Sequence, residues 1–463
     1  MERTLTKDTV SKIGETVLLK GWVQTRRDHG KIVFLDIRDR WGIVQVVATS
    51  EVASKVNSEW VVAITGQVKA RPEKLINEKI VTGKVEISAE KIEILAEAKT
   101  LPFPIDTPGL EIDEDTRLKY RYLDIRRDRM KNNLLLRHKA IQEIRRFLTT
   151  QDFVEVETPI LTKATPEGAR DFIVPSRLYP GKFYALPQSP QQYKQLLMVA
   201  GIERYFQIAR CFRDEDPRVD RAYGEFTQLD MEMSFTTQQE IRSLVEELFI
   251  HLVKEIFPEK HITKIPFPVL DYTETVKKYG TDRPDLRENK NDNNELAFCW
   301  VVDFCLFEWK EKENRWDAEH HPFTAPKPED IDFLFHGNPK EFGNLRADQY
   351  DFILNGFEIG GGSIRITDPK LQMRIFEILG HTKEGIEQKF GHLLEAFTYG
   401  VPPHGGIAPG IDRFLMAALG EPTVREVIAF PIGASGRTPV MNAPSEVEPE
   451  QLVELGISVS TRR

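Results

Sequence analysis

Two neighbouring charged segments in the middle of the chain carry residue types that bind nucleotides. Arg210–Asp216 supplies arginines and carboxylates, and Glu225–Asp230 follows it with an aromatic ring at Phe226. An α-phosphate needs a fixed guanidinium, because negative charge builds on its oxygens in the transition state. An adenine ring needs an apolar or aromatic face on which to stack. Strand-like residues on each side of the charged loop would bring these groups together, although a hairpin tip held by salt bridges has the same composition.

Two further segments combine glycine or a helix start with polar residues. In Gly405–Met416, glycines let the backbone approach a ligand closely, and an arginine at the start of the apolar helix can reach a triphosphate. Ordinary strand-to-helix turns share this pattern. Gln188–Lys194 opens another apolar helix, where Ser189 and Pro190 fit an N-cap and first-turn pair. The start of a helix also readily holds a small anionic or amide-bearing ligand.

Paired carboxylates in Tyr350–Arg365 suggest a metal site. Asp351 and Glu358 are seven residues apart, so on one straight strand they would lie on opposite faces. A turn or bulge at Asn355-Gly356 would reset the register. Mg²⁺ is usually held by one or two protein carboxylates together with phosphate oxygens, which such a pair could provide. The alternative is an exposed hairpin.

The N-terminal elements needed to position a nucleic-acid ligand are short β-type runs between about Val17 and Ile94. Glycine, Asp-Arg and proline signals separate the runs, and their spacing predicts a five-stranded OB barrel, a fold that often binds single-stranded nucleic acid. The four clearest runs are Val17–Val23, Lys31–Arg38, Gly42–Val47 and Trp60–Gly66.

Beyond the barrel, the pattern predicts a mixed α and β domain. The two prolines in Lys99–Ile105 indicate a linker. A helix is expected within Leu136–Thr149, followed by a strand over Phe153–Thr158 that ends at Pro159. Neither the regular βαβ alternation of a Rossmann fold nor a GxxxxGK[ST] phosphate loop occurs. ATP would therefore have to be held by side chains of an antiparallel sheet.

Composition agrees with an ordinary multidomain globular protein. The chain has 463 residues, of which 40% are hydrophobic and 29% charged, and its length predicts two or three domains. The net charge of −9 argues against non-specific coating of nucleic acid but leaves room for a local basic face. There is no apolar run of membrane length and no apolar signal-peptide core, so we expect a cytoplasmic protein.

The three cysteines, Cys211, Cys299 and Cys305, do not have the spacing of a zinc site or of a disulfide framework. We therefore expect them to act as small buried hydrophobic residues.

Taken in order, these segments resemble the class II aminoacyl-tRNA synthetases. Phe212–Glu215 (Phe-Arg-x-Glu) and Gly410–Arg413 (Gly-x-x-Arg) look like motifs 2 and 3, and the helix leading to Pro159 looks like motif 1, the dimer-forming element. The resemblance narrows to the bacterial aspartyl-tRNA synthetases and covers nearly the whole chain. The segments that carry this narrower match are Arg170–Arg177, Gln188–Lys194, His320–Thr324 and Gly361–Arg365.

The resemblance implies an α+β fold class, with an N-terminal OB-fold β-barrel followed by a class II antiparallel-sheet catalytic domain. The expected domains are an anticodon-binding barrel at 1–105, a linker or hinge at 106–130 and a catalytic domain at 131–463. Bacterial members usually carry a large insertion domain, and here a short linker, 288–295, stands in its place. Contacts of that domain with tRNA would be missing.

By similarity, two arginines are the catalytic residues. Arg213 would grip the α-phosphate and the substrate carboxylate, and Arg413 the γ-phosphate of a bent ATP. Phe226 would stack on the adenine, while Glu358 and Asp351 would carry Mg²⁺ as the metal cofactor. The implied ATP-binding residues are Arg213, Asp214, Glu215, Phe226, Glu358, Gly410, Ile411, Asp412 and Arg413.

For the amino acid, the resemblance implies a cationic clamp on the side-chain carboxylate of L-aspartate. Arg365 can bind a carboxylate bidentately, and Lys194 adds a point charge. Asparagine would leave these cations under-compensated. The implied aspartate-binding residues are Glu167, Ser189, Gln191, Lys194, Arg213, Asp230, His320 and Arg365.

The barrel resembles the anticodon-binding domain of the family. Phe34 would stack on an anticodon base, with Gln45 and Arg27 reading base edges, although core packing is the alternative for Phe34. His29 is typical of members that charge both tRNA-Asp and tRNA-Asn, whereas Lys74 is not. We expect relaxed specificity, which would require an amidotransferase partner downstream.

The motif 2 loop departs from the family pattern. Arg221–Phe226 is one residue longer than the usual Arg-Gln-Pro-Glu-Phe, so the glutamine that normally contacts ATP is lost. Ala222 or Tyr223 is its nearest replacement in sequence.

The resulting hypothesis is a homodimeric aspartate–tRNA ligase that activates L-aspartate with ATP and charges tRNA-Asp, and also tRNA-Asn if specificity is relaxed. Asparaginyl- or lysyl-type synthetases share the subclass, but two cations suit neither amino acid. A synthetase-like paralogue with a non-tRNA substrate and an RNA-binding regulator without catalysis are the remaining alternatives. The complete motif arginines and the retained barrel argue against both.

Overall fold

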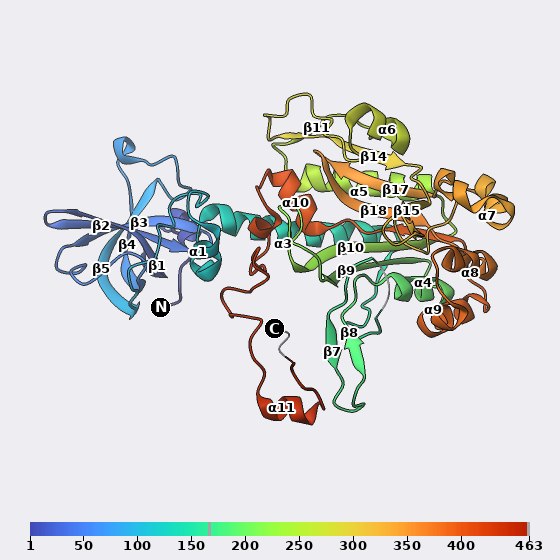
Figure 1. Cartoon of the computed structure of the whole chain (residues 1–463). Coiled ribbons are helices and arrows are strands. Elements are labelled where there is room, and N and C mark those ends of the chain that lie inside the picture. The colour runs from blue at the N-terminus through green and yellow to red at the C-terminus, as the bar shows by residue number, and fades with distance from the viewer. Residues whose placement is uncertain (165–167, 461–463) are drawn as a thin grey trace. The chain divides into compact units, whose positions relative to one another are not determined.

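A computed structural model describes residues 1–164 and 168–460, and its contacts divide the chain into two compact units. Unit 1 is Met1–Pro104 and unit 2 is Ile105–Arg463 (Figure 1). None of the helices in the described ranges combines the length and the apolar character needed to cross a bilayer.

Unit 1 is a closed five-stranded barrel with strand order β1-β2-β3-β5-β4. Alternation of apolar and polar residues produces it: in β2, Val33, Leu35 and Ile37 are buried in the barrel core while the residues between them point outward. The expected OB barrel is thus confirmed. Its elements are η1 (Thr6–Ser11), β1 (Thr16–His29), β2 (Ile32–Asp39), β3 (Gly42–Thr49), β4 (Val61–Ala70), η2 (Glu73–Leu75) and β5 (Val85–Ala96).

Unit 2 is built on an eight-stranded, mostly antiparallel sheet, as expected for the catalytic domain. Only the end pairs, β12 with β14 and β6 with β9, run parallel. In spatial order the strands are β12 (Val269–Asp271), β14 (Phe298–Val302), β17 (Gln349–Leu354), β18 (Phe357–Ile364), β19 (His404–Ile407), β10 (Gly224–Ser234), β9 (Arg204–Arg213) and β6 (Val154–Glu155).

Three two-stranded sheets and a set of helices surround the large sheet (Figure 1). The small sheets are β7 (Ile173–Pro175) with β8 (Phe183–Ala185), β11 (His261–Ile262) with β13 (Glu295–Leu296), and β15 (Phe307–Lys310) with β16 (Arg315–Ala318). The α-helices are α1 (Glu114–Lys119), α2 (Arg121–Asp124), α3 (Asp128–Thr150), α4 (Gln191–Val199), α5 (Gln238–Ile256), α6 (Tyr272–Tyr279), α7 (Ile331–His336), α8 (Pro369–Ile378), α9 (Lys383–Phe397), α10 (Ile411–Leu419) and α11 (Pro449–Glu454). Short 3₁₀ turns are η3 (Pro328–Asp330), η4 (Pro339–Asn344) and η5 (Val424–Val427).

The core of unit 2 forms where α5 packs on the sheet. A capping box between Thr237 and Glu240 starts α5, and the buried residues that follow recur at helical spacing. Phe249 of α5 lies with its ring centroid 4.9 Å from those of both Phe352 on β17 and Phe414 on α10. This aromatic contact fixes the sheet strands and α10, which together carry the candidate site.

Two elements differ in length from the expectation. Helix α3 begins at Asp128, before the predicted start at Leu136, whereas the strand predicted over Phe153–Thr158 contracts to β6 (Val154–Glu155). These two residues pair with β9 as the parallel edge of the sheet, and the Val156 amide donates to the Phe206 carbonyl (3.1 Å).

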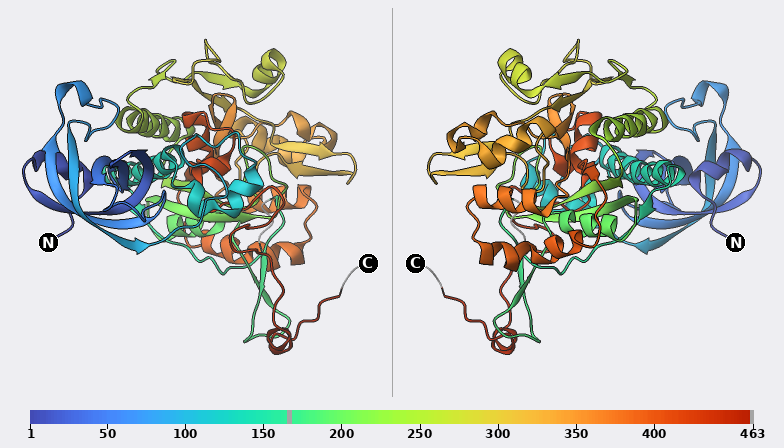
Figure 2. Two further views of the ribbon diagram at one scale, coloured as in Figure 1. Left: turned by 90° about the vertical axis from the view of Figure 1, so that its left-hand side faces the viewer. Right: turned by 90° about the vertical axis from the view of Figure 1, so that its right-hand side faces the viewer.

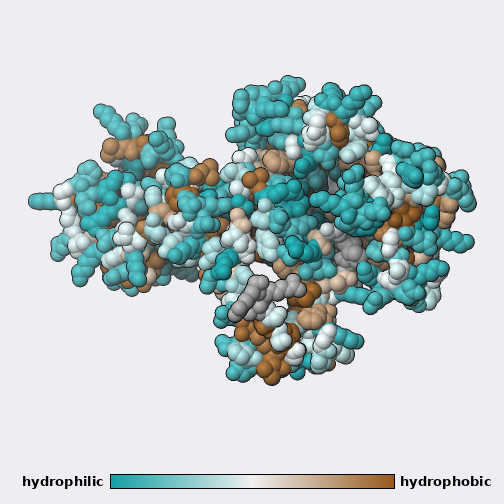
Figure 3. Space-filling model, viewed as in Figure 1, coloured by the Kyte–Doolittle hydropathy of each residue, from teal (hydrophilic) through white to brown (hydrophobic). Residues whose placement is uncertain are grey.

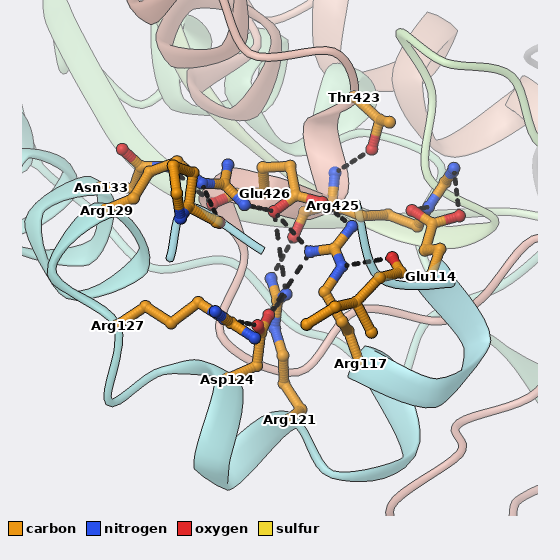
Figure 4. A network of polar contacts seen from close by, with 12 residues as sticks. Glu114, Arg117, Arg121, Asp124, Arg127, Arg129, Asn133, Thr423, Arg425 and Glu426 are labelled. Atoms are coloured by element: carbon orange, nitrogen blue, oxygen red, sulfur yellow. Dashed lines mark hydrogen bonds and ion pairs between the residues drawn. The ribbon is translucent and has the colours of Figure 1, made fainter. Parts of the chain in front are cut away.

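The segment 106–130, expected as a linker, is folded into unit 2 (Figure 4). Helices α1 and α2 lie within it, and a buried ionic network joins it to η5. Glu426 pairs with Arg117 (Nη2–Oε1 2.9 Å) and Arg129 (Nη2–Oε2 2.8 Å), and Asp124 with Arg121 (2.9 Å) and Arg127 (2.7 Å). These arginines are buried or largely buried, and each has a buried carboxylate partner.

The short linker at 288–295 is an ordered loop closed by one side chain. Glu295 is buried, and its carboxylate accepts hydrogen bonds from the backbone amides of Glu288 (2.7 Å) and Asn289 (2.9 Å) and from the Thr263 hydroxyl (3.1 Å). These bonds lower the pKa of Glu295 against the opposing effect of burial. The chain thus passes directly to β14.

Hairpin β7–β8 and helix α11 project together from the rest of unit 2 (Figures 1 and 2). Arg177 and Glu454 form an ion pair (3.8 Å) between them. Leu178, Tyr179 and Val453 are largely exposed, and hydrophobic surface gathers on this projection in Figure 3. Exposed apolar surface of this kind is typical of contact sites for other proteins.

Two of the three cysteines, Cys211 and Cys299, are buried, as predicted. Cys305 is half-buried, and its sulfur accepts a hydrogen bond from Arg346 Nη1 (3.1 Å).

Candidate active site

A cavity of about 260 Å³ opens on unit 2 between β9, β10, β18 and the starts of α4 and α10. It gathers most of the nucleotide- and substrate-binding candidates from segments far apart in the chain. The candidates that line it are Ser189, Gln191, Lys194, Arg213, Glu215, Phe226, Asp230, His320, Glu358, Arg365, Gly410, Asp412 and Arg413.

Three candidates do not line this cavity in the described part of the chain. Ile411 is buried in the core, and Asp214 accepts a hydrogen bond from the Tyr223 hydroxyl (2.9 Å) beside the cavity. Asp351 is buried one layer behind the wall, against Gly361. Glu167 lies outside the described residues.

One end of the cavity holds the two motif arginines. The Arg213 guanidinium lies over the Phe226 ring, 5.0 Å from its centroid, and its Nε donates to the Gln188 carbonyl (3.3 Å). Arg413 donates through Nε to the Asp220 carbonyl (3.0 Å) and also to the Glu358 carbonyl. Backbone carbonyls thus help to orient both guanidiniums, and the carboxylates of Asp220 (3.6 Å) and Glu358 (3.8 Å) lie near that of Arg413.

Asp412 lines the cavity, but its carboxylate is used in contacts with other parts of the protein. Its carboxylate accepts a hydrogen bond from the Thr227 amide (2.9 Å) and pairs with Arg137 of α3. These contacts anchor the start of α10, which carries Arg413, to the strand that carries Phe226.

The carboxylate pair lies on two strands joined by a tight turn, as predicted. Asn355 and Gly356 both have positive φ (50° and 85°), and a bulge lies between Phe352 and Ile353. Burial and the nearby negative charge of Glu358 raise the pKa of Asp351 well above its usual range. Two neighbouring carboxylates beside the motif arginines have the oxygen ligands that suit a divalent cation, and Glu358 is the one that lines the cavity.

The other end of the cavity holds two buried cations. Lys194 Nζ lies 3.0 Å from Asp230 Oδ2 and 3.3 Å from Glu232 Oε2. Arg365 binds Glu232 bidentately, with Nε–Oε1 at 2.9 Å and Nη2–Oε2 at 3.1 Å. The two cations expected to form the clamp therefore both contact Glu232, and in this structure both are paired with protein carboxylates.

Sequence reasoning missed Glu232. It lies two residues after Asp230 on β10, so the two carboxylates share one face of the strand. Gly406 makes room for it: a Cβ there would lie 2.1 Å from Glu232 Oε2. The glycines read as room for a ligand therefore accommodate, at this position, a carboxylate of the protein itself.

Burial and ion pairing act on the two carboxylates at this end in different ways. Burial alone would raise the pKa of Glu232, but Arg365 and Lys194 lower it to about 2, so this group stays ionised. Burial raises the pKa of Asp230, against the effect of Lys194. Two buried cations therefore lie at this end together with at least one firm anion, Glu232.

Two histidines complete the pocket around Arg365. Arg365 Nη1 lies 2.6 Å from His321 Nε2 and 2.6 Å from the Ser363 hydroxyl oxygen. Burial, with the positive charge of Arg365, lowers the pKa of His320 to about 3, and burial lowers that of His321 well below its usual range. Because arginine only donates, His321 Nε2 must accept, which requires a neutral ring. Sequence reasoning quoted His321 but did not place it in the site.

In unit 1, four of the predicted anticodon residues lie on the barrel strands. Phe34 is outside the barrel core and only half-buried, which disfavours core packing. Its ring meets that of His29 edge-on at 5.5 Å. Arg27, its cross-strand neighbour, pairs with Asp36 (2.8 Å), while Gln45 Nε2 donates to Glu86 (3.3 Å).

Lys74, the fifth predicted residue, lies in η2 between β4 and β5. In an OB barrel this connection is one of the loops that border the nucleic-acid face.

Two family descriptions match the chain. Residues 113–434 match the family described as tRNA synthetases class II (D, K and N), and residues 17–95 match the OB-fold nucleic acid binding domain.

Curated relatives match over nearly their full length. The Aspartate–tRNA(Asp/Asn) ligase of Rubrobacter xylanophilus is 42% identical, over 97% of this chain and 95% of the relative. That of Dictyoglomus turgidum is 43% identical, over 96% of each. The first alignment runs over 578 positions, more than the 463 residues of this chain, so the relative contains a long stretch without a counterpart here.

Solved structures share the fold. Asparaginyl-tRNA synthetase from Pyrococcus horikoshii, complexed with asparaginyl-adenylate, superposes with a TM-score of 0.74 at 24% identity, over 97% of this chain and 100% of that one. Aspartyl tRNA synthetase from Entamoeba histolytica gives 0.73 at 25% identity, over 93% of this chain and 91% of that one.

Proposed function

The chain belongs to the class II tRNA synthetases of the aspartate, lysine and asparagine group, and we propose that it activates L-aspartate with ATP and esterifies it onto tRNA. The observation that carries the proposal is the pair of buried cations, Lys194 and Arg365, that line one end of the cavity, which suits an anionic amino acid. The side chain of asparagine or lysine carries no negative charge to place beside them.

The two ends of the cavity have different proposed roles, one in binding ATP and the other in binding the amino acid. Arg213 would hold the α-phosphate and the substrate carboxylate, Arg413 the γ-phosphate, and Phe226 the adenine face. Asp230 Oδ1, buried and without a hydrogen-bond partner among the described residues, is available to the substrate ammonium. The aspartate α-carboxylate then attacks the α-phosphorus in line and pyrophosphate leaves. A carboxylate is already a nucleophile, so positioning and charge neutralisation suffice without a general base. The 3′-terminal hydroxyl of tRNA then attacks the adenylate carbonyl and releases AMP.

Mg²⁺ is the proposed metal cofactor. Glu358, supported by Asp351, would hold it together with phosphate oxygens. When bound, the ion neutralises charge on the triphosphate.

We further propose that the chain charges both tRNA-Asp and tRNA-Asn. The names of the relatives and His29 on the barrel support relaxed specificity, whereas Lys74 does not. Aspartyl-tRNA-Asn would then pass to an amidotransferase.

The protein is proposed to act in the cytoplasm as a homodimer through α3, which resembles motif 1. The apolar projection of β7–β8 and α11 adds surface suited to contact with a second copy.

A charging assay with two amino acids and two purified tRNAs tests the proposal. We expect aspartate to be esterified to both tRNAs and asparagine to neither. Absence of aspartylation on tRNA-Asn would contradict relaxed specificity, and charging with asparagine instead of aspartate would contradict the assigned substrate.

A further inference from the structure

The loop between β9 and β10 forms part of the wall at the phosphate end of the cavity. Asp220, Arg221 and Ala222 line the cavity, and Ala222 is buried. The loop leaves the paired strands at Arg213 and returns at Gly224, whose φ of +80° turns the chain back into β10. Its position therefore decides the shape of the place where a triphosphate would lie.

Several contacts hold the loop against the cavity. Arg221 pairs with Glu215 inside the loop. Asp220 contacts Arg413 through both its carbonyl (3.0 Å) and its carboxylate (3.6 Å). The Val424 amide of η5 donates to the Val219 carbonyl (3.0 Å). The loop thus contacts one of the two motif arginines directly.

Tyr223 joins the loop to three other segments. It lies in the part of the loop that is one residue longer than the family pattern. Its hydroxyl donates to Asp214 Oδ1 (2.9 Å) at the end of β9. Its ring meets Phe172 edge-on at 6.1 Å, and Gly436 of the C-terminal segment lies against it, where an added Cβ would be 3.7 Å from the ring. Tyr223 itself does not line the cavity within the described residues.

We propose that Tyr223 is a positioning residue that, through its bond to Asp214, holds the β9–β10 loop closed over the ATP end of the cavity. This inference rests on the proposed use of ATP and deepens it. A loop that is already ordered avoids the entropic cost of closing on the ligand. When the closed state is only partly populated, the apparent affinity for the ligand falls by the same fraction.

The decisive variant is Tyr223→Phe, which removes one hydroxyl and keeps the ring. Loss of one hydrogen bond of ordinary strength should weaken ATP binding about three- to tenfold. Asp214→Ala removes the acceptor and should weaken it similarly, and the double variant should be no weaker than either single variant, because the same contact is removed in all three. Tyr184→Phe, on the exposed projection, is the matched control and should bind ATP like the unmodified chain.

Two measurements on the full-length protein separate positioning from general stability. Calorimetric titration with ATP gives the affinity, and amide hydrogen exchange of the peptide 215–223 reports loop opening. We expect weaker ATP binding and faster exchange in that peptide, with Tm unchanged. An unchanged affinity, unchanged exchange in the peptide, or a drop in Tm that accounts for both effects would overturn the proposal. If the unmodified chain did not bind ATP, the proposed function would fail. Amide hydrogen exchange of the peptide 215–223 would still show whether Tyr223 keeps the loop in place.

Discussion

At the scale of single residues, Glu232 explains how two cations can be buried side by side. An isolated buried ammonium or guanidinium is costly, and two would repel one another. Glu232 contacts both Lys194 and Arg365, and its pKa of about 2 keeps it ionised throughout the neutral range. Asp230 contacts Lys194 as well, and burial raises its pKa. Selectivity for an anion thus depends on how two cations and two carboxylates share their charge rather than on the two cations alone.

Arg365→Leu tests this balance. The variant would lose one of the two buried cations and its bidentate guanidinium, so aspartate-dependent pyrophosphate exchange should fall at least about 100-fold. Arg365→Lys keeps the charge but loses the bidentate geometry. Its rate of pyrophosphate exchange should lie between those of the unmodified chain and Arg365→Leu. Arg374→Leu changes a partly exposed arginine of α8 outside the cavity and serves as control. Near-normal exchange in Arg365→Leu would rule out the assigned role.

At the scale of elements, the β17–β18 turn and the short linker support one another. The Asn355 side chain accepts from the Ala297 amide (2.8 Å) and donates to the Glu295 carbonyl (3.0 Å). Gly356 lies against Asp285, where an added Cβ would be 3.3 Å from the Asp285 Cβ. The turn that brings Asp351 and Glu358 together is thus held in place by residues 285–297, a segment that contains the short linker.

Asn355→Ala should therefore lower the free energy of unfolding by more than the change in backbone strain alone would. Asn314, in the turn between β15 and β16, has the same φ of 50° but is exposed. Both substitutions place alanine in the left-handed region, whereas only Asn355→Ala removes two buried hydrogen bonds. We expect the free energy of unfolding, measured by urea denaturation, to fall about 2 kcal/mol further in Asn355→Ala than in Asn314→Ala. Equal losses would show that the turn does not depend on the linker.

At the scale of the whole molecule, each unit has its own core. In unit 2, an ionic network also joins an early segment to one near the C-terminus. The network in Figure 4 joins residues 114–133 to residues 421–426. Glu426 lies at its centre, and η5, which carries it, also places Val424 in the cavity wall. Arg117 and Arg129 hold the pKa of Glu426 below its usual range against the effect of burial. The first helices of unit 2 therefore help to shape the site.

Glu426→Gln should leave several buried guanidiniums without their shared carboxylate. We expect unit 2 to lose about 3 kcal/mol of unfolding free energy at neutral pH, measured by urea denaturation. Because the pKa of Glu426 is lowered by folding, its contribution is fully present above the unfolded pKa near 4.5 and is lost as pH falls through the folded value. The difference between variant and unmodified chain should accordingly shrink below pH 4.5. Glu313→Gln, in an exposed ion pair with Arg315, should change stability by less than about 1 kcal/mol.

The sequence by itself determined the barrel, the mixed sheet and most residues of the cavity. Apolar alternation along β2 and the turn residues Asn355-Gly356 are local signals, and the arginine motifs at Arg213 and Arg413 are specific in spacing. These features follow from residues close together in the chain, where periodicity and turn chemistry act directly.

Only the tertiary structure decided which charges meet. The pairing of Glu232 with Arg365, of Glu426 with Arg117, and of Asp412 with Arg137 joins residues more than one hundred positions apart. No periodic pattern encodes such partners, so 106–130 read as a linker and Glu232 went unnoticed. The partners of Glu232 and Glu426 then lower the pKa of these two groups against the effect of burial, because the energy of an ionised group depends on the charges and solvent around it.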